Sequence, residues 1–177
     1  MRLTAIWAPV GAALALFTLT ACGSSSEKEV ASGTVTDSET GEKTQYQVTR
    51  KDDGSGGTLR IEGKNGDILF GAGADAAQMP KGFTLYPGSK ITGGMNTRGG
   101  DGQHVVAQFE VSAPLSKVVE HLEGQMQAHG MTITTKANQG GTQMVIAESE
   151  EGPINNILVT ATEDGGKTSG SFTYTQK

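Results

Sequence analysis

The feature that most constrains the fold is a change in the spacing of apolar residues near the middle of the chain. In "QHVVAQFEV", residues 103–111, apolar and polar side chains alternate as in a strand with one buried face. In the following "SAPLSKVVEHLEGQMQAHG" the apolar residues recur every three or four positions, which is typical of an amphipathic helix. We therefore expect a helix near residues 113–129, with Ser112 as N-cap and Gly130 as its stop. The expected buried stripe is Leu115, Val118, Val119, Leu122 and Met126.

Strand-like segments lie on both sides of this helix. Four follow it, "MTITT", "TQMVIAE", "NNILVTAT" and "SGSFTYT". Residues 33–73 contain two turn patterns, Thr-Gly-Glu-Lys and Asn65-Gly66, each between alternating runs, which predict two hairpins. The chain has 26 glycines in 177 residues, a fraction about twice the usual ~7 %. These glycines lie between the strand-like runs, as expected of tight turns. The two hairpins have too few apolar residues for a core and are expected to lean on another part of the protein.

These patterns predict an α+β fold, an antiparallel sheet covered by one amphipathic helix and preceded by β-hairpins. The expected organisation is a signal segment at 1–21, a flexible tether at 22–32, a β-hairpin region at 33–78 and an α+β domain at 79–177. The stretch "MPKGFTLYPGSKI" and the strand and helix after it, about residues 79–135, resemble a set of small, uncharacterised exported bacterial proteins. That resemblance implies no activity.

The N-terminal segment has the layout of a secretory signal peptide. Arg2 is followed by the mostly apolar run "LTAIWAPVGAALALFTL" and then by small residues. An uncleaved membrane helix is the alternative, because the charge-free stretch approaches the ~20 residues that span a bilayer. Pro9 and Gly11 interrupt that stretch, which favours the signal peptide.

The segment ends in "LTAC", which resembles the lipobox of bacterial lipoproteins. The resemblance implies that Cys22 carries a diacylglyceryl group, that residues 1–21 are removed, and that the chain is anchored in a membrane by lipid. Cys22 is the only cysteine, so acylation would also occupy a thiol that has no disulfide partner. The same resemblance implies, because residue 23 is Gly and not Asp, the periplasmic face of the outer membrane in a two-membrane cell. The alternative is the outer leaflet of the plasma membrane.

Charge and motifs argue against nucleic acids, nucleotides and cofactors as ligands. Lys and Arg number 14 against 19 Asp and Glu, and the basic residues do not cluster, as phosphate-backbone binding requires. The stretches "GAGADA" at 71–76 and "GGKTSG" at 165–170 resemble nucleotide loops. Neither is followed by the helix whose N-terminus would hold phosphate, so we expect turns there and no cofactor.

No catalytic or metal motif is present in the sequence. His104, His121 and His129 lack the spacing of a metal site, and His129 is expected to have a structural role. The acidic runs at 52–53, 148–151 and 163–164 flank glycine-rich turns and are expected to be solvated. We therefore expect a non-catalytic module that binds an envelope protein or other partner through a sheet edge or face. The alternative is an envelope hydrolase or small-ligand-binding protein whose site is assembled from scattered residues.

Overall fold

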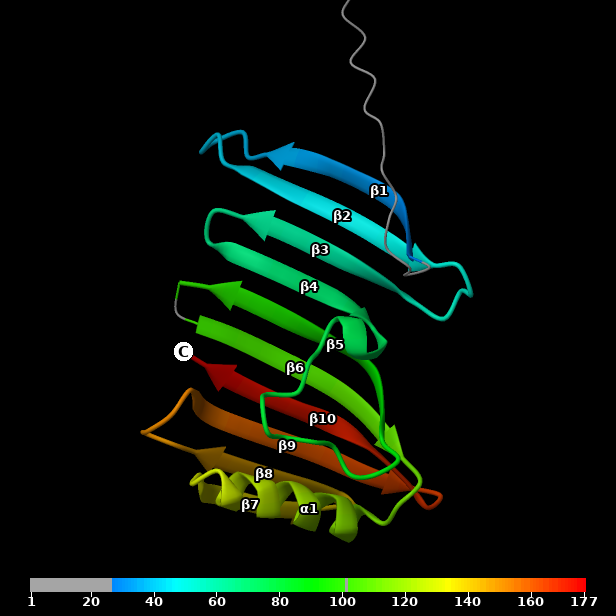
Figure 1. Ribbon diagram of the computed structural model, residues 1–177, viewed down its shortest axis with the longest axis vertical. Coiled ribbons are helices and arrows are strands. Elements are labelled where there is room, and N and C mark those ends of the chain that lie inside the picture. Colours follow the sequence, from blue (N-terminus) through cyan, green and yellow to red (C-terminus); the bar gives the residue numbers. More distant parts are fainter. Residues whose placement is uncertain (1–26, 101) are drawn as a thin grey trace, which may run out of the picture.

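The computed structural model describes residues 27–100 and 102–177, which form one ten-stranded antiparallel sheet and one α-helix (Figure 1). The strand order is β1-β2-β3-β4-β5-β6-β10-β9-β8-β7. The predicted α+β class, with an antiparallel sheet and a single amphipathic helix, is confirmed for these residues, although the sheet dominates the fold. The elements are β1 (Glu27–Thr36), β2 (Lys43–Lys51), β3 (Gly57–Gly63), β4 (Gly66–Ala72), η1 (Gly73–Asp75), β5 (Lys90–Gly99), β6 (Gly102–Val111), α1 (Leu115–Ala128), β7 (Thr132–Gln139), β8 (Thr142–Glu148), β9 (Ile154–Asp164) and β10 (Lys167–Gln176).

The chain forms two antiparallel meanders that meet in the middle of the sheet. Strands β1 to β6 follow one another side by side, and α1 then carries the chain to the far edge of the sheet. From there β7, β8 and β9 run back toward β6, and β10 fills the remaining place between β6 and β9. The sheet is therefore continuous only because β10 pairs with both meanders.

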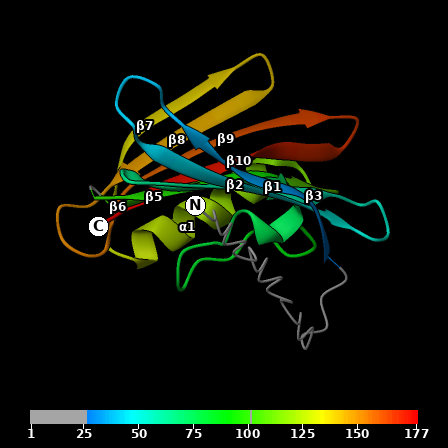
Figure 2. The same cartoon turned by 90° about the horizontal axis from the view of Figure 1, so that it is seen from above.

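Helix α1 packs on one face of the sheet, against β7, β8, β9 and β10 (Figures 1 and 2). The five residues of the predicted stripe are all buried. They lie in a core with Val105, Phe109, Ile157 and Phe172, whose alternating positions place them on the sheet face beneath the helix. The helix does not reach β1 to β4, so the expectation of a helix-covered sheet is wrong for that part.

The N-terminal end of the helix differs from the sequence prediction, whereas the C-terminal end agrees with it. The N-cap is Pro114, which has no side-chain acceptor, and Ser112 does not cap the helix. The backbone N–H of Leu115 instead donates to Oε2 of Glu163, which is near the end of β9, at 2.8 Å. At the other end Gly130 has a φ of +74°, as expected of the predicted stop, and the N–H of Met131 donates to the carbonyl of Met126.

The segment between β4 and β5 lies on the same face as the helix (Figure 2). It begins with the short η1 turn and then buries Ala76, Ala77 and Phe83. The hydroxyl of Tyr174 donates to the carbonyl of Gln78 and fixes the middle of the segment to β10. This segment and α1 together form the second layer of the structure.

The two predicted hairpins are present as β1–β2 and β3–β4. They do not lean on a separate core, because β4 pairs with β5 and the sheet simply continues from 72 to 93 across the expected boundary at residue 78. Residues 27–32, which were expected to belong to the tether, form the first part of β1. The N-terminal strands thus extend the sheet sideways as a single layer.

Candidate functional site

The apolar side chains of the N-terminal strands face away from the helix. Val105 is fully buried on the helix side of β6, so its neighbour Val106 points to the other face. Val106 pairs with Met95, Met95 with Phe70, and Phe70 with Leu59. Directly opposed residues of antiparallel strands share a face, so all of these side chains lie on the face opposite α1. We call this the open face.

Two rows of side chains cross the open face at right angles to the strands. The first row is almost entirely apolar, and the second mixes β-branched, aromatic and polar residues. The register defines the first row as Ala31, Val48, Leu59, Phe70, Met95, Val106, Thr173, Leu158 and Ile146. It defines the second row as Gly33, Tyr46, Ile61, Ile68, Thr97, His104, Thr175, Asn156 and Glu148.

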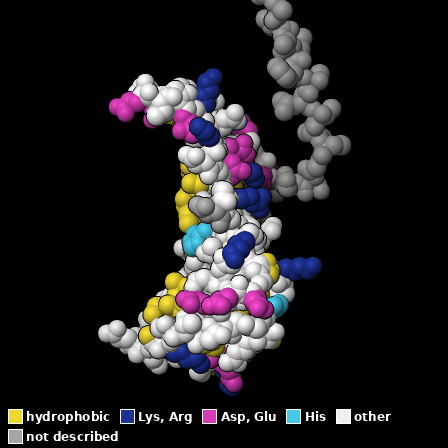
Figure 3. Space-filling view, turned by 90° about the vertical axis from the view of Figure 1, so that its left-hand side faces the viewer, with side chains coloured by type: hydrophobic (Ala, Val, Ile, Leu, Met, Phe, Trp, Pro, Cys, Tyr) yellow, Lys and Arg dark blue, Asp and Glu magenta, His cyan; other side chains and the backbone are white. Residues whose placement is uncertain are grey.

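Over β1 to β6 the open face is apolar, and no other described element covers it. The first row contains no charged side chain, and Phe70 is 40 % exposed. Hydrophobic side chains run along this flank of the molecule in the upper left of Figure 3. A shallow groove of about 570 Å³, lined by Val48, Leu59 and Phe70 among others, adjoins a second of about 530 Å³ that shares Phe70. At these positions the open face therefore has shallow grooves and no enclosed cavity.

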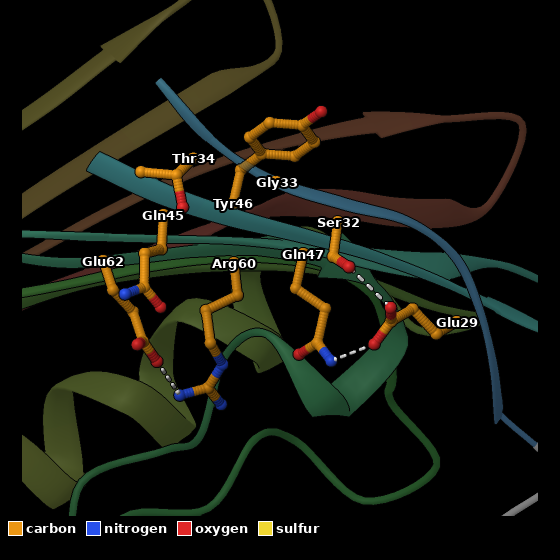
Figure 4. A pocket seen from close by; sticks show the side chains of 9 residues that line it. All are labelled: Glu29, Ser32, Gly33, Thr34, Gln45, Tyr46, Gln47, Arg60 and Glu62. Atoms are coloured by element: carbon orange, nitrogen blue, oxygen red, sulfur yellow. Dashed lines mark hydrogen bonds and ion pairs between the residues drawn. The ribbon is translucent and has the colours of Figure 1, made fainter. Parts of the chain in front are cut away.

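The opposite face of the same strands is polar. Gln45, Gln47, Arg60 and Glu62 lie on it, and Figure 4 shows Tyr46 projecting to the other side of the sheet from the two glutamines. Its groups pair with one another: Arg60 lies 3.6 Å from Glu62, and Nε2 of Gln47 donates to the carboxylate of Glu29 at 2.7 Å. Hydrogen bonds from Ser32 and Gln47 hold the pKa of the exposed Glu29 below its usual value. On this polar face the charged and amide groups thus bind one another.

Two of the three histidines hold the segment after β4 against α1. The His121 ring lies 2.7 Å from Nε2 of Gln125, which also donates to the carbonyl of Thr84 at 2.6 Å. His129 stacks on Phe83, with ring centroids 4.3 Å apart, and its Nε2 lies 3.2 Å from the carbonyl oxygen of Gly82. His129 is exposed and lies just past the last residue of α1, and its contacts are structural ones, as expected for it.

His104 and the acidic runs make fewer contacts with the rest of the chain than His121 and His129 do. His104 is exposed on the open face, where Nδ1 lies 3.2 Å from the hydroxyl of Thr175. Asp53 accepts hydrogen bonds from Ser55, which hold its pKa below the usual value, and Glu163 is used at the helix N-terminus. Among the described residues no cluster of three or more His, Cys, Asp or Glu is placed to hold a metal ion.

The two glycine-rich stretches do not begin a helix of useful length. The first contains the last two residues of β4 and the three-residue η1 turn, and the second forms the tight turn before β10 and the first four residues of β10. Gly73 has a φ of +74° and Gly165 one of +56°, conformations typical of glycine turns. The predicted turns are confirmed, and whether the chain binds nucleotides stays a prediction.

The predicted lipidation site, Cys22, lies outside the described residues. In the part that is described, α1 is neither long nor apolar enough to cross a bilayer. Comparison with known protein families, with curated proteins and with solved structures found no match to this chain.

Proposed function

We propose that this protein is a lipid-anchored lipoprotein of the bacterial envelope that acts as a non-catalytic binding module through its open face. The observation that carries the binding role is the reversal of the apolar pattern. In β6 and β10 most large apolar residues face the helix, whereas in β2, β3 and β4 all but Leu69 face the opposite side, the open face. A strand pattern that puts Leu59, Ile61 and Ile68 on an uncovered surface is typical of an interaction site.

The composition of the open face supports the same role. Protein interfaces have a core depleted of charge and enriched in aromatic residues and Met, surrounded by a polar rim. The middle of this face holds Tyr46, Phe70 and Met95, and its charged residues, such as Arg50 and Lys90, lie toward the strand ends. The face therefore has the arrangement of an interface.

The sheet edges are less suited to binding than the face. The edge strands are β1 and β7, and each is interrupted by a bulge, at 29–31 and at 133–135. Bulges and charged side chains on edge strands block the addition of a further strand. Lys28 and Lys136 supply such charges. We therefore assign binding to the open face and not to an edge.

The anchor is proposed from the lipobox alone. A diacylglyceryl group on Cys22 would hold the chain stably, since each buried methylene contributes about 0.8 kcal/mol and two chains anchor where one is marginal. We expect the Cys22→Ala variant to lose fatty-acid labelling and signal removal. Unchanged labelling of the variant would refute the anchor and leave the binding role to be tested separately. Fractionation of the envelope would then distinguish the outer membrane from the outer leaflet of the plasma membrane.

Binding can be tested by site-specific photocrosslinking in intact cells. A photoreactive amino acid at Phe70 lies in the first row, whereas one at Asp67, in the same strand, lies on the polar face. We expect a discrete crosslinked product from position 70 and none from position 67. Equal products, or none from either position, would contradict the assignment of the open face.

A further inference from the structure

We infer that the open face binds the open face of a second copy of this chain, with a two-fold axis that runs along the sheet at right angles to its strands. This inference rests on the proposed function and names the partner for that site. The two sheets would form a sandwich whose outer layers are the polar face and the helix. Each copy would contribute the same two rows of residues, because a two-fold interface uses one surface twice.

The positions of the two rows make the face complementary to itself. In β3 the rows lie on either side of Arg60, the central residue of the strand, at Leu59 and Ile61. In β4 they lie on either side of Leu69, at Phe70 and Ile68. An axis through these strand centres therefore places the first row of one copy over the second row of the other, and each strand over its own counterpart.

The two rows also differ in shape in a way that allows them to interdigitate. Over β3 to β5 the first row presents the long side chains of Leu59, Phe70 and Met95, and the second presents the β-branched Ile61, Ile68 and Thr97. Facing layers pack well when long and compact side chains alternate across the interface. The geometry thus pairs the flexible residues of one copy with the stiff residues of the other.

The area is sufficient for a stable dimer. Strands β1 to β6 are spaced about 4.8 Å apart and about seven residues of each share the face, at about 3.3 Å a residue. The face therefore measures roughly 650 Å² in projection, and its side-chain relief makes the accessible area larger. A standard interface buries about 800 Å² on each partner. Pairing of all ten strands is not needed to reach this value.

The axis also agrees with an anchor at the N-terminus. β1 is the edge strand at one end of the sheet, so the axis brings the two β1 strands together at the same end of the dimer (Figure 1). Both chains could then be attached to one membrane. An arrangement with β1 of one copy over β7 of the other would place the two anchors at opposite ends, about 40 Å apart for nine strand spacings.

Thiol crosslinking of the full chain in intact cells tests this arrangement. Ile61→Cys places a thiol on the open face close to the axis, and Glu62→Cys places one on the polar face of the same strand. Two packed sheets lie about 10 Å apart, so a short bis-maleimide can join the two copies at position 61. The wild-type chain, whose only cysteine is Cys22, measures any background. We expect a product of twice the chain mass from Ile61→Cys alone.

The other outcomes overturn the inference and are distinguishable. If Ile61→Cys is joined to a different protein and not to itself, the self-association is wrong while the proposed binding role stands. If neither variant forms any product although free maleimide labels both, the self-association is wrong, and the proposed binding role is decided by photocrosslinking at position 70. Products of equal yield from positions 61 and 62 would show random collision and would also overturn the inference.

Sedimentation of the detergent-extracted full chain provides a second measurement. We expect Ile61→Lys to weaken the dimer at least about tenfold, because it buries a charge at the interface core, and Glu62→Lys to leave it unchanged. Far-UV circular dichroism checks that both variants remain folded. A chain that sediments as a monomer at all concentrations, with or without the substitution, would refute the second copy as partner.

Discussion

Replacing Leu122 by Ala tests whether α1 supplies the core of this protein. Leu122 is 1 % exposed and lies in the buried cluster between the helix and the sheet. The change removes three carbon atoms, worth about 2.4 kcal/mol at about 0.8 kcal/mol per buried methylene. The cavity left behind adds to this, so that Leu→Ala changes in cores cost about 2 to 5 kcal/mol in total. That is a large part of a stability of about 5 to 15 kcal/mol.

Gln127→Ala is the matched control, because Gln127 is in the same helix and exposed. Glu123 is less suitable, since its carboxylate lies 2.7 Å from Nζ of Lys136. The control is expected to change stability by no more than about 0.5 kcal/mol. Unfolding in urea, followed by far-UV circular dichroism, measures both variants. Equal, small effects of the two substitutions would refute the core assignment.

Four further outcomes are expected. Glu163→Ala removes the acceptor for the N–H of Leu115 and should cost about 0.5 to 2 kcal/mol, whereas Glu150→Ala, at an exposed position, should cost almost nothing in the same urea assay. Gly94→Ala should destabilise by about 1 to 3 kcal/mol because its methyl group would overlap Ala77, whereas Gly100→Ala has open space. Burial raises the pKa of Tyr174 above its usual value of 10.0, against a smaller opposing effect of Arg98. The stability that the neutral hydroxyl contributes is therefore present below about pH 10 and is lost as the pH rises through the folded-state pKa. In Tyr174→Phe, the free energy of unfolding measured in urea should fall less with rising pH in this range. Calorimetric titration with NAD, FAD and ATP should give no binding heat, and micromolar binding lost on changing Gly73 or Lys167 would contradict this.

Local patterns allowed the helix and most strands to be predicted, but not their neighbours. The spacing of apolar residues from Leu115 to Met126 is enough to predict a helix with one buried side, because it depends on neighbouring residues alone. The helix is expected near 113–129 and is found at Leu115–Ala128. The cap could not be found in this way, because its acceptor, Glu163, is 48 residues from Leu115. The pairing of β4 with β5 likewise joins residues that are distant in the sequence, so the pattern within each strand does not reveal it. For this reason the hairpins were expected to lean on another part of the protein and not to extend the sheet.

The open face was missed for a related reason. Alternation within one strand shows that one side is apolar but does not show which side of the finished sheet that is. Relating Leu59 to Val105 needs the register of every strand between them. One signal was available: counting outward from the predicted turn at Asn65-Gly66 pairs Ile61 with Phe70, and the turn that the structure has, at Lys64-Asn65, pairs it with Ile68. Either register places two large apolar residues opposite each other and already indicates a continuous apolar surface.

The place of β10 in the sheet has a consequence for how the chain is made. A chain that emerges from the ribosome N-terminus first can form β1 to β6 in order, but β6 then waits without its second partner while α1, β7, β8 and β9 are synthesised. Contacts between β6 and β10 span more than 50 residues, and such distant pairings form slowly. Until β10 arrives, two unfinished sheets expose the edges of β6 and β9. Loss of β10 by premature termination would therefore divide the sheet into two smaller sheets of one chain, each with an exposed edge prone to aggregation, whereas loss of β1 would only shorten the sheet.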